Sequence, residues 1–152
     1  MIQIIDNFFD EKSCKYLIEY FEKNKDKHFI HTTGVKFIDI TNNESDLNFI
    51  LKKIKDYVFN LNKYQIDFIQ IVKWFDDCSH GLHTDYASDK TVFSSINYLN
   101  EGYIGGQTFF EEGTIIAPRK GRGLFFDGVN YKHGVMKVKR GPRYTLAGWY
   151  KK

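Results

Sequence analysis

The sequence predicts one α+β domain, in which N-terminal helices pack on one sheet of a jelly-roll-like β core. The length of 152 residues and the apolar fraction of 42% are typical of a single soluble globular domain. Helical periodicity is confined to the first part of the chain, and short β-rich segments follow it. We therefore expect one domain made of a helical support region, residues 1–64, and a jelly-roll core, residues 65–152.

Two apolar stripes predict the helices of the support region. The first follows Asp10, a residue type that favours the N-cap position, and its members are Cys14, Leu17, Ile18 and Phe21. The second starts near Asn43 or Ser45 and comprises Leu47, Ile50, Leu51, Ile54, Val58 and Leu61. Between the stripes, HFIHTTGVKFIDIT has short apolar stretches broken by Gly34, which indicates strands or a loop.

Segments rich in β-branched and aromatic residues predict seven or eight strands in the second half. They are YQIDFIQIVKWF, TVFSSINYL, QTFF, TIIAP, GLFFDG, HGVMKVK and RYTLAGWY. Glycine-containing or polar segments separate them and are expected to form turns: DDCSHG, ASDK, NEGYIGG, EEG and RKGRG. Short strands joined in this way are typical of an antiparallel sandwich or barrel, an architecture that lectins, cupins and oxygenases share.

Composition bears on the cellular location of the protein and on its partners. Its two cysteines, Cys14 and Cys78, are too few and too far apart for a disulfide scaffold, which favours a reducing, cytoplasmic location. No apolar run approaches the length of a membrane span, and the N-terminus lacks the features of a signal peptide. Residues 119–152 carry ten Lys and Arg against one acid, Asp127, so this region either steers an anionic partner or forms a solvated face.

His83 and Asp85, in the segment GLHTDYASD, are the first candidates for a metal site. An acid two residues after a histidine is common by chance, but His133 follows 50 residues later and Arg143 ten residues after that. Two histidines and one carboxylate form the ligand set that binds Fe(II) on three adjacent positions and leaves the others open. The first two ligands can converge from a strand end and its turn, and the third must come from elsewhere in the fold.

With these residues the chain resembles the 2-oxoglutarate- and Fe(II)-dependent dioxygenases, in particular their prolyl 4-hydroxylase-like branch. The opening IQIIDNFFDEKSCKYLIEYF is similar to that family's N-terminal strand and helix, and HTD matches its HxD motif. SSINYLNEGYIGGQTFF, GRGLFFDGVNYKHGV and GPRYTLAGWY are similar to later family segments, in the family's order. The resemblance covers most of the chain and implies a double-stranded β-helix, which is the jelly-roll core of this family.

The resemblance also implies the roles of individual residues. His83, Asp85 and His133 would bind iron and take part in catalysis. Arg143 would pair with the distal carboxylate of 2-oxoglutarate, for which a planar guanidinium offers a bidentate fit. Tyr98 would donate a hydrogen bond to the same carboxylate.

Two further residues, Trp149 and Thr108, are implied to line the same pocket, and one position departs from the family. Trp74 stands where many relatives have a tyrosine that touches the cosubstrate or the substrate. An indole N–H can donate a hydrogen bond but cannot act as a phenol, which leaves substrate choice open. The other histidines, His28, His31 and His80, have no partner pattern and are expected in surface positions or loops, with residues 31–34 as a lid over the site.

The implied activity is hydroxylation of a C–H bond with Fe(II), 2-oxoglutarate and O2, with ascorbate as an optional reductant. By analogy, the first expectation for the substrate is a prolyl residue in a peptide or protein. Another protein side chain, a free amino acid or a small metabolite are alternatives. A non-catalytic cupin-like or lectin-like metal-binding module is the rival from another class. Nucleic acid is disfavoured as a partner, because no base-stacking set with interleaved Lys and Arg is evident.

Overall fold

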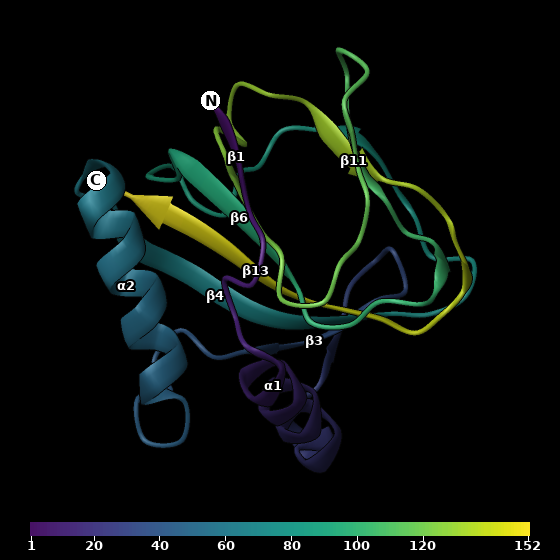
Figure 1. The fold of residues 1–152 in the computed structure, drawn as a ribbon, viewed down its shortest axis with the longest axis horizontal. Coiled ribbons are helices and arrows are strands. Elements are labelled where there is room, and N and C mark those ends of the chain that lie inside the picture. The colour runs from purple at the N-terminus through teal and green to yellow at the C-terminus, as the bar shows by residue number, and fades with distance from the viewer.

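Two β-sheets face each other around the centre of the molecule, and both helices lie outside the larger sheet (Figure 1). The computed structural model describes residues 1–152. The larger sheet has seven strands in the order β1-β10-β6-β13-β4-β3-β2, and the smaller has four in the order β5-β11-β8-β9. A third pairing joins β12 to β7. This mostly β arrangement with two outer helices is the predicted jelly-roll core.

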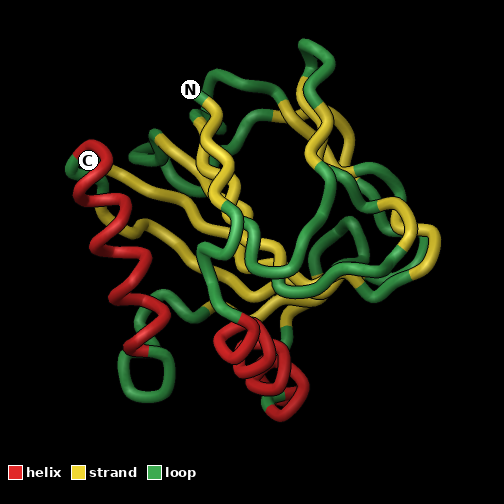
Figure 2. Tube along the Cα trace, in the orientation of Figure 1, coloured by secondary structure: helices red, strands yellow, loops and turns green.

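The elements follow the chain as alternating helices and strands at first and as strands alone afterwards (Figure 2). In the support region they are β1 (Ile2–Ile5), α1 (Glu11–Lys23), the 3-10 turn η1 (Lys25–Lys27), β2 (Phe29–Ile30), β3 (Lys36–Asp39) and α2 (Asn48–Asn62). In the core they are β4 (Gln65–Trp74), β5 (His80–His83), β6 (Phe93–Tyr98), β7 (Ile104–Gly105), β8 (Thr108–Phe110), β9 (Ile115–Ile116), β10 (Gly123–Phe126), β11 (His133–Val135), β12 (Val138–Arg140) and β13 (Arg143–Lys151).

Helix α1 begins where the sequence predicts, and α2 does not. The Asp10 carboxylate accepts the Ser13 amide at 2.7 Å and caps α1. Helix α2 begins at Asn48, after an N-cap residue, Leu47, that makes no side-chain capping bond. Asn43 and Ser45, near which the helix was expected to start, lie in a preceding turn, where the Asn43 side chain accepts the Asp46 amide at 3.3 Å.

The predicted number of strands in the second half of the chain is too low. Ten strands, rather than seven or eight, lie beyond residue 64. Strand β5 forms at the end of DDCSHG and beyond it, and β7 forms inside NEGYIGG, both of which were expected to be turns. HGVMKVK splits into β11 and β12, which belong to different sheets. Residues 1–64 are also more than a helical support, since β1, β2 and β3 pair into the larger sheet.

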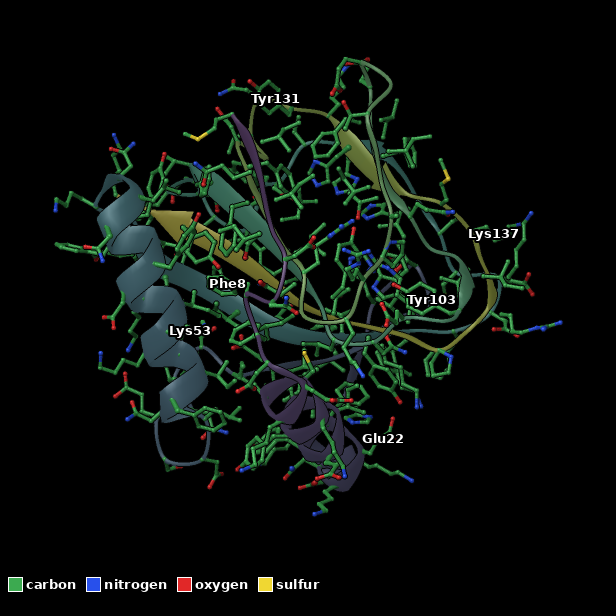
Figure 3. All side chains as sticks on the ribbon, in the orientation of Figure 1. Phe8, Glu22, Lys53, Tyr103, Tyr131 and Lys137 are labelled. Carbon is green, nitrogen blue, oxygen red and sulfur yellow. The ribbon has the colours of Figure 1, made fainter.

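The two faces of the larger sheet carry different side chains, because successive residues of a strand point to opposite faces. On the outer face, Ile69 and Ile71 of β4 and Leu146 of β13 pack with the buried stripes of both helices. Glu22, at the end of α1 (Figure 3), accepts a hydrogen bond from Lys73 of β4 at 2.5 Å and another from Tyr144 of β13. The inner face looks into the space between the sheets and carries the residues described below.

On the other flank of the helical layer, Lys53 of α2 and Phe8 lie together (Figure 3), with the Lys53 ammonium 5.2 Å from the Phe8 ring centroid. Neither helix has the length and apolarity that crossing a membrane requires. The helices thus form an outer layer that supports the sheet from behind.

Leu51→Ala should destabilise the fold by about 2–5 kcal/mol, because it leaves a cavity among fully buried side chains between α2 and the sheet. The matched control is Asn60→Ala, an exposed position on the same helix that should change stability by less than about 0.5 kcal/mol. Urea unfolding followed by circular dichroism measures both variants. Equal midpoints for the two would show that this face of α2 carries no core.

Candidate functional site

His83, Asp85 and His133 meet at the junction of β5 and β11. The two strands pair antiparallel, and their register sets His83 directly opposite His133. Asp85 follows two residues after β5, and its amide donates to the Gly128 carbonyl at 2.8 Å, which fixes the turn. One donor atom from each of the three side chains lies within 4.8 Å of the others. The structure therefore gathers the three candidate ligands in the manner of a three-ligand metal site.

Both histidine rings are oriented by backbone carbonyls. Nδ1 of His83 lies 2.8 Å from the Gly81 oxygen, and Nδ1 of His133 lies 2.9 Å from the Tyr131 oxygen. A carbonyl oxygen accepts only, so each Nδ1 carries the proton and each Nε2 keeps a free lone pair. Both Nε2 atoms face the Asp85 carboxylate, at 3.7 Å for His83 and 3.4 Å for His133. Hydrogen bonds from Nδ1 to backbone carbonyls, like those to Gly81 and Tyr131, are a usual way in which proteins orient metal-binding imidazoles.

The protonation states also suit metal binding. Burial lowers the pKa of His83 and favours its neutral form. Burial acts to raise the pKa of Asp85, but its contacts with His133, Ser94 and His83 outweigh this effect and hold that pKa below its usual value. A neutral imidazole and an ionised carboxylate are the forms that bind a metal ion.

His80 belongs to this cluster, contrary to the expectation that it is a surface or loop residue. It lies in β5 and stacks on His83, with ring centroids 3.7 Å apart. Burial, with the neighbouring histidines, lowers the pKa of His80 to about 4. On the other side of the site, His133 packs edge-on against Phe126 at 4.6 Å between centroids. The candidate ligands are thus packed between aromatic rings that limit their motion.

A cavity of about 460 Å³ extends from these three residues across the inner face of the larger sheet. Arg143, at the start of β13, lines it at one end, and its side chain is only 1% exposed. Its Nε donates to the Gly106 carbonyl at 2.9 Å. Gly106 has φ +71° and approaches Arg143 so closely that a β-carbon there would lie 2.9 Å from the Arg143 Cδ. A side chain at this position would therefore displace the guanidinium.

Arg143 is buried without an acidic partner. Among its neighbours the guanidinium carbon lies 4.9 Å from the Trp74 ring centroid and 5.5 Å from that of Tyr98, and no carboxylate lies within ion-pair distance. Burying a cation without a counter-charge is costly, and aromatic faces offset only part of that cost. A carboxylate bound in the cavity would supply the missing charge through a bidentate contact.

Two further donors near Arg143 have no hydrogen-bond partner. The indole Nε1 of Trp74 is buried and unpaired, and Trp74 lines the cavity. The hydroxyl of Tyr103, on the side of the molecule away from α2 (Figure 3), is also buried and unpaired. Burial raises the pKa of Tyr103, so this hydroxyl stays protonated and able to donate. Unpaired buried donors are rare, and the Trp74 donor, which lines the cavity together with Arg143, fits an acceptor-rich anion such as 2-oxoglutarate.

The remaining predicted pocket residues differ in their positions. Trp149 lines the cavity, as the sequence resemblance implies. Tyr98 and Thr108 are fully buried and lie behind Arg143, where the Tyr98 hydroxyl is 2.5 Å from the Thr108 hydroxyl. Nη2 of Arg143 lies 3.5 Å from the same Thr108 oxygen. In this structure the two residues support Arg143 from behind the cavity wall, and direct contact with a cosubstrate remains a prediction.

Half of the ten basic residues in the C-terminal region pair with acids. Arg119 and Arg122 pair with Asp6, and Lys120 pairs with Glu11 at 2.7 Å. Two further pairs join Lys132 to Glu111 and Lys151 to Asp67. Lys137, by contrast, lies on the outer edge of the molecule (Figure 3). The charge excess seen in the sequence therefore does not form one continuous cationic face.

Sequence reasoning missed part of the cavity. Asp39 and Gln70 line its far end, and His80 lines it near the ligands. His31 and Thr33 lie on its wall, consistent with the idea that residues 31–34 cover the site. Alternation along β3 and β4 could have identified Asp39 and Gln70 as inner-face residues, since both follow the parity of their neighbours in the cavity. No motif marks His80.

Comparison with known proteins gives a family match. The family model described as the 2OG-Fe(II) oxygenase superfamily matches residues 69–151, more than half of the chain. Human prolyl 3-hydroxylase 3 is 40% identical over 65 residues. That match covers 38% of this chain and only 9% of the human protein, so it informs a segment and not the whole human enzyme.

Several solved structures share the fold. A prolyl-4-hydroxylase of Pseudomonas putida aligns with a TM-score of 0.84 at 17% identity, covering 99% of this chain and 92% of that one. A viral collagen prolyl hydroxylase from Paramecium Bursaria Chlorella virus-1, solved as a 2OG complex, aligns at 0.76 with 22% identity over 99% and 94% of the two chains. A Trichoplax adhaerens prolyl hydroxylase, in complex with a hypoxia inducible factor oxygen degradation domain peptide fragment, aligns at 0.80 with 16% identity over 99% and 83%. At these identities the likeness establishes the fold alone.

Asp85→Ala should abolish tight Fe(II) binding, because it removes the one anionic ligand of the candidate site. His31→Ala, on the cavity wall but outside the three-residue cluster, is the matched control and should bind metal as the wild type does. Anaerobic titration calorimetry with Fe(II), repeated with Co(II) and its absorption bands, measures both variants. Unchanged metal affinity in Asp85→Ala would remove this carboxylate from the site.

Proposed function

This chain belongs to the 2OG-Fe(II) oxygenase superfamily, and on that premise we propose that it hydroxylates a prolyl residue in a peptide or protein. The family makes it an oxidoreductase that uses Fe(II) and 2-oxoglutarate. When bound, these two groups supply the activation of O2 that lets an oxygen atom enter an unactivated C–H bond. The choice of a prolyl substrate is supported by the fold shared with prolyl hydroxylases and by the segment similar to human prolyl 3-hydroxylase 3.

The observation that carries the assignment is a buried guanidinium with no acidic partner in the same cavity as the three candidate ligands. Arg143 would bind the distal carboxylate of 2-oxoglutarate, and the Trp74 indole N–H is free to donate to the same group. His83, Asp85 and His133 would hold Fe(II) through two imidazole nitrogens and a carboxylate oxygen. Residues of this chain would therefore hold one end of the cosubstrate directly and the Fe(II) ion in the same cavity.

The protein's own contribution to the reaction is orientation and shielding. The Gly81 and Tyr131 carbonyls hold the two imidazoles in the metal-binding tautomer. Val72, Thr145 and Ala147 form the floor of the cavity between Arg143 and its open end. Beyond them, the exposed Tyr86 and the half-buried Trp149 flank the space in which a substrate would meet the iron. The apolar CH2 groups of a pyrrolidine ring pack well against aromatic side chains of this kind.

Arg143→Gln should raise the concentration of 2-oxoglutarate needed for binding by about tenfold to 150-fold, because it removes a charge-assisted pair worth about 1.5–3 kcal/mol. Anaerobic calorimetry on the metal-loaded protein measures the affinity without requiring turnover. Arg140→Gln, which removes an exposed guanidinium three residues earlier, is the control and should leave the affinity unchanged. An Arg143→Gln protein that folds and binds 2-oxoglutarate normally would refute the assigned role of Arg143.

A peptide library containing single prolines should give products heavier by about 16 Da, the mass of one oxygen atom, when supplied with Fe(II) and 2-oxoglutarate. Mass spectrometry with fragmentation locates the oxygen on proline. Peptides in which alanine replaces proline serve as controls. Oxidation of a different side chain, or of free amino acids and small metabolites only, would overturn the prolyl proposal and keep the reaction class.

A further inference from the structure

The ionisable groups that line the cavity can be assigned one by one, and one carboxylate is left over. Asp85 belongs to the candidate metal ligands and Arg143 to the candidate cosubstrate site. Apart from the histidines and Tyr86, the only other ionisable side chain of the lining is Asp39. Asp39 forms no ion pair, and one of its oxygens accepts the Thr41 amide at 2.8 Å. Its second oxygen has no bonding partner within the protein.

The geometry of β3 directs Asp39 into the cavity. Ile38, its neighbour in sequence, is buried in the opposite layer against the helices, and Phe37 on the other parity lines the cavity. Because side chains alternate along a strand, Asp39 shares the inner face with Phe37. The register pairs Asp39 with Gln70 of β4, another lining residue. Asp39 and Gln70 thus form one polar row across the two strands at the open end of the cavity.

Aromatic side chains surround this polar row. Phe37 lies two residues before Asp39 on the same strand, and Phe68 lies two residues before Gln70 on the neighbouring one. Both are half-buried and line the cavity. A carboxylate beside aromatic faces favours a cation, since the ring faces and the acid attract positive charge together. The same surroundings disfavour an anionic group.

We propose that Asp39, with Phe37 and Phe68, forms a subsite for a basic side chain of the substrate, a lysine or an arginine close to the hydroxylated residue. This inference rests on the proposed function for its peptide substrate. It makes Asp39 a specificity-determining residue that the iron and cosubstrate chemistry does not use.

Strand spacing gives the width of the cavity floor beside Asp39. Asp39 lies two strands from Ala147, another lining residue, so these two positions are about 10 Å apart. An extended peptide advances about 3.3 Å per residue, so a peptide that crosses this floor spans it with about three residues. The test therefore places the basic residue at each of the three positions on either side of the proline.

The turnover test compares peptides that differ at one position near a single proline, with Lys, Arg, Gln or Glu placed at each of three positions on either side. We expect kcat/KM for the best Lys or Arg peptide to exceed that of its Gln counterpart by about tenfold, and the Glu counterpart to be the poorest. Asp39→Asn should remove this preference, because Asn keeps an acceptor for the Thr41 amide and loses the charge. The control Asp46→Asn removes an equal charge from the turn before α2 and should keep the preference. Hydroxylation of prolyl peptides without any preference for Lys or Arg would overturn the subsite.

A binding test does not depend on turnover. Butylguanidinium and its neutral isostere butylurea are titrated into the protein, and the fluorescence of Trp149 in a Trp74→Phe background reports occupancy of the cavity. In the protein that keeps Asp39, we expect butylguanidinium to bind more tightly than butylurea. In the Asp39→Asn variant, we expect the two compounds to bind with equal affinity. Equal affinities in the protein that keeps Asp39 would overturn the subsite. A clear preference for the cation together with no prolyl hydroxylation would support the subsite and overturn only the prolyl substrate.

Discussion

A buried positive charge without a protein counter-charge is the constraint around which the cavity is built. Arg143 begins β13, where it pairs with Trp74 of β4, and from Thr145 onward β13 pairs with β6 as well, so the sheet holds the backbone of this strand in place. One carbonyl, one hydroxyl and two aromatic rings contact the guanidinium, and all of them are neutral. Isolated charges in a protein interior are tolerated only when something compensates them. Burial of Arg143 therefore destabilises the free protein, and a dicarboxylate bound at Arg143, as proposed, would offset this. Cosubstrate affinity would then depend on the packing behind the cavity wall.

That packing is possible because one face of the larger sheet packs against the helices and the opposite face lines the cavity. Along β13, Leu146 packs with the helices while Thr145 and Ala147 face the cavity, and β4 repeats the pattern with Ile71 and Gln70. Because successive side chains point to opposite faces, a shift of one residue in register would put isoleucine into the cavity and glutamine into the core. The apolar outer face thus fixes the register, and the register in turn fixes which polar groups face the cavity. The helices contribute no lining residue, yet their buried stripe determines where the lining residues lie.

The sequence predicts the parts of this arrangement that have a period or a motif. The spacing of Cys14, Leu17, Ile18 and Phe21 identifies α1, and the succession of His83, Asp85, His133 and Arg143 identifies the residues that the fold gathers around one cavity. Strands β5 and β7 were missed because polar residues and glycines hide them, and they exist through pairing with β11 and β12. The start of α2 was missed because it has no capping side chain, so burial of Leu47 fixes it instead. The neighbours of His80 and Asp39 come from strands that are far apart in the sequence. No local pattern in the sequence therefore predicts that these two residues line the cavity.

The cavity consequently has two ends with different physical requirements. At the Arg143 end, walls of buried side chains exclude water, so each donor that faces the cavity would interact strongly with a carboxylate bound there. At the Asp39 end, the carboxylate is exposed and its attraction for a cation is weaker and screened by salt. A closed end suits a cosubstrate that is the same in every turnover, because an end that binds one constant ligand need not accommodate others. An open end suits a polymer that must enter, present one residue and leave, for which modest attraction to a neighbouring side chain gives selectivity without slowing release. The gradient from buried to exposed charge along the inner face of one sheet is sufficient to separate the two tasks.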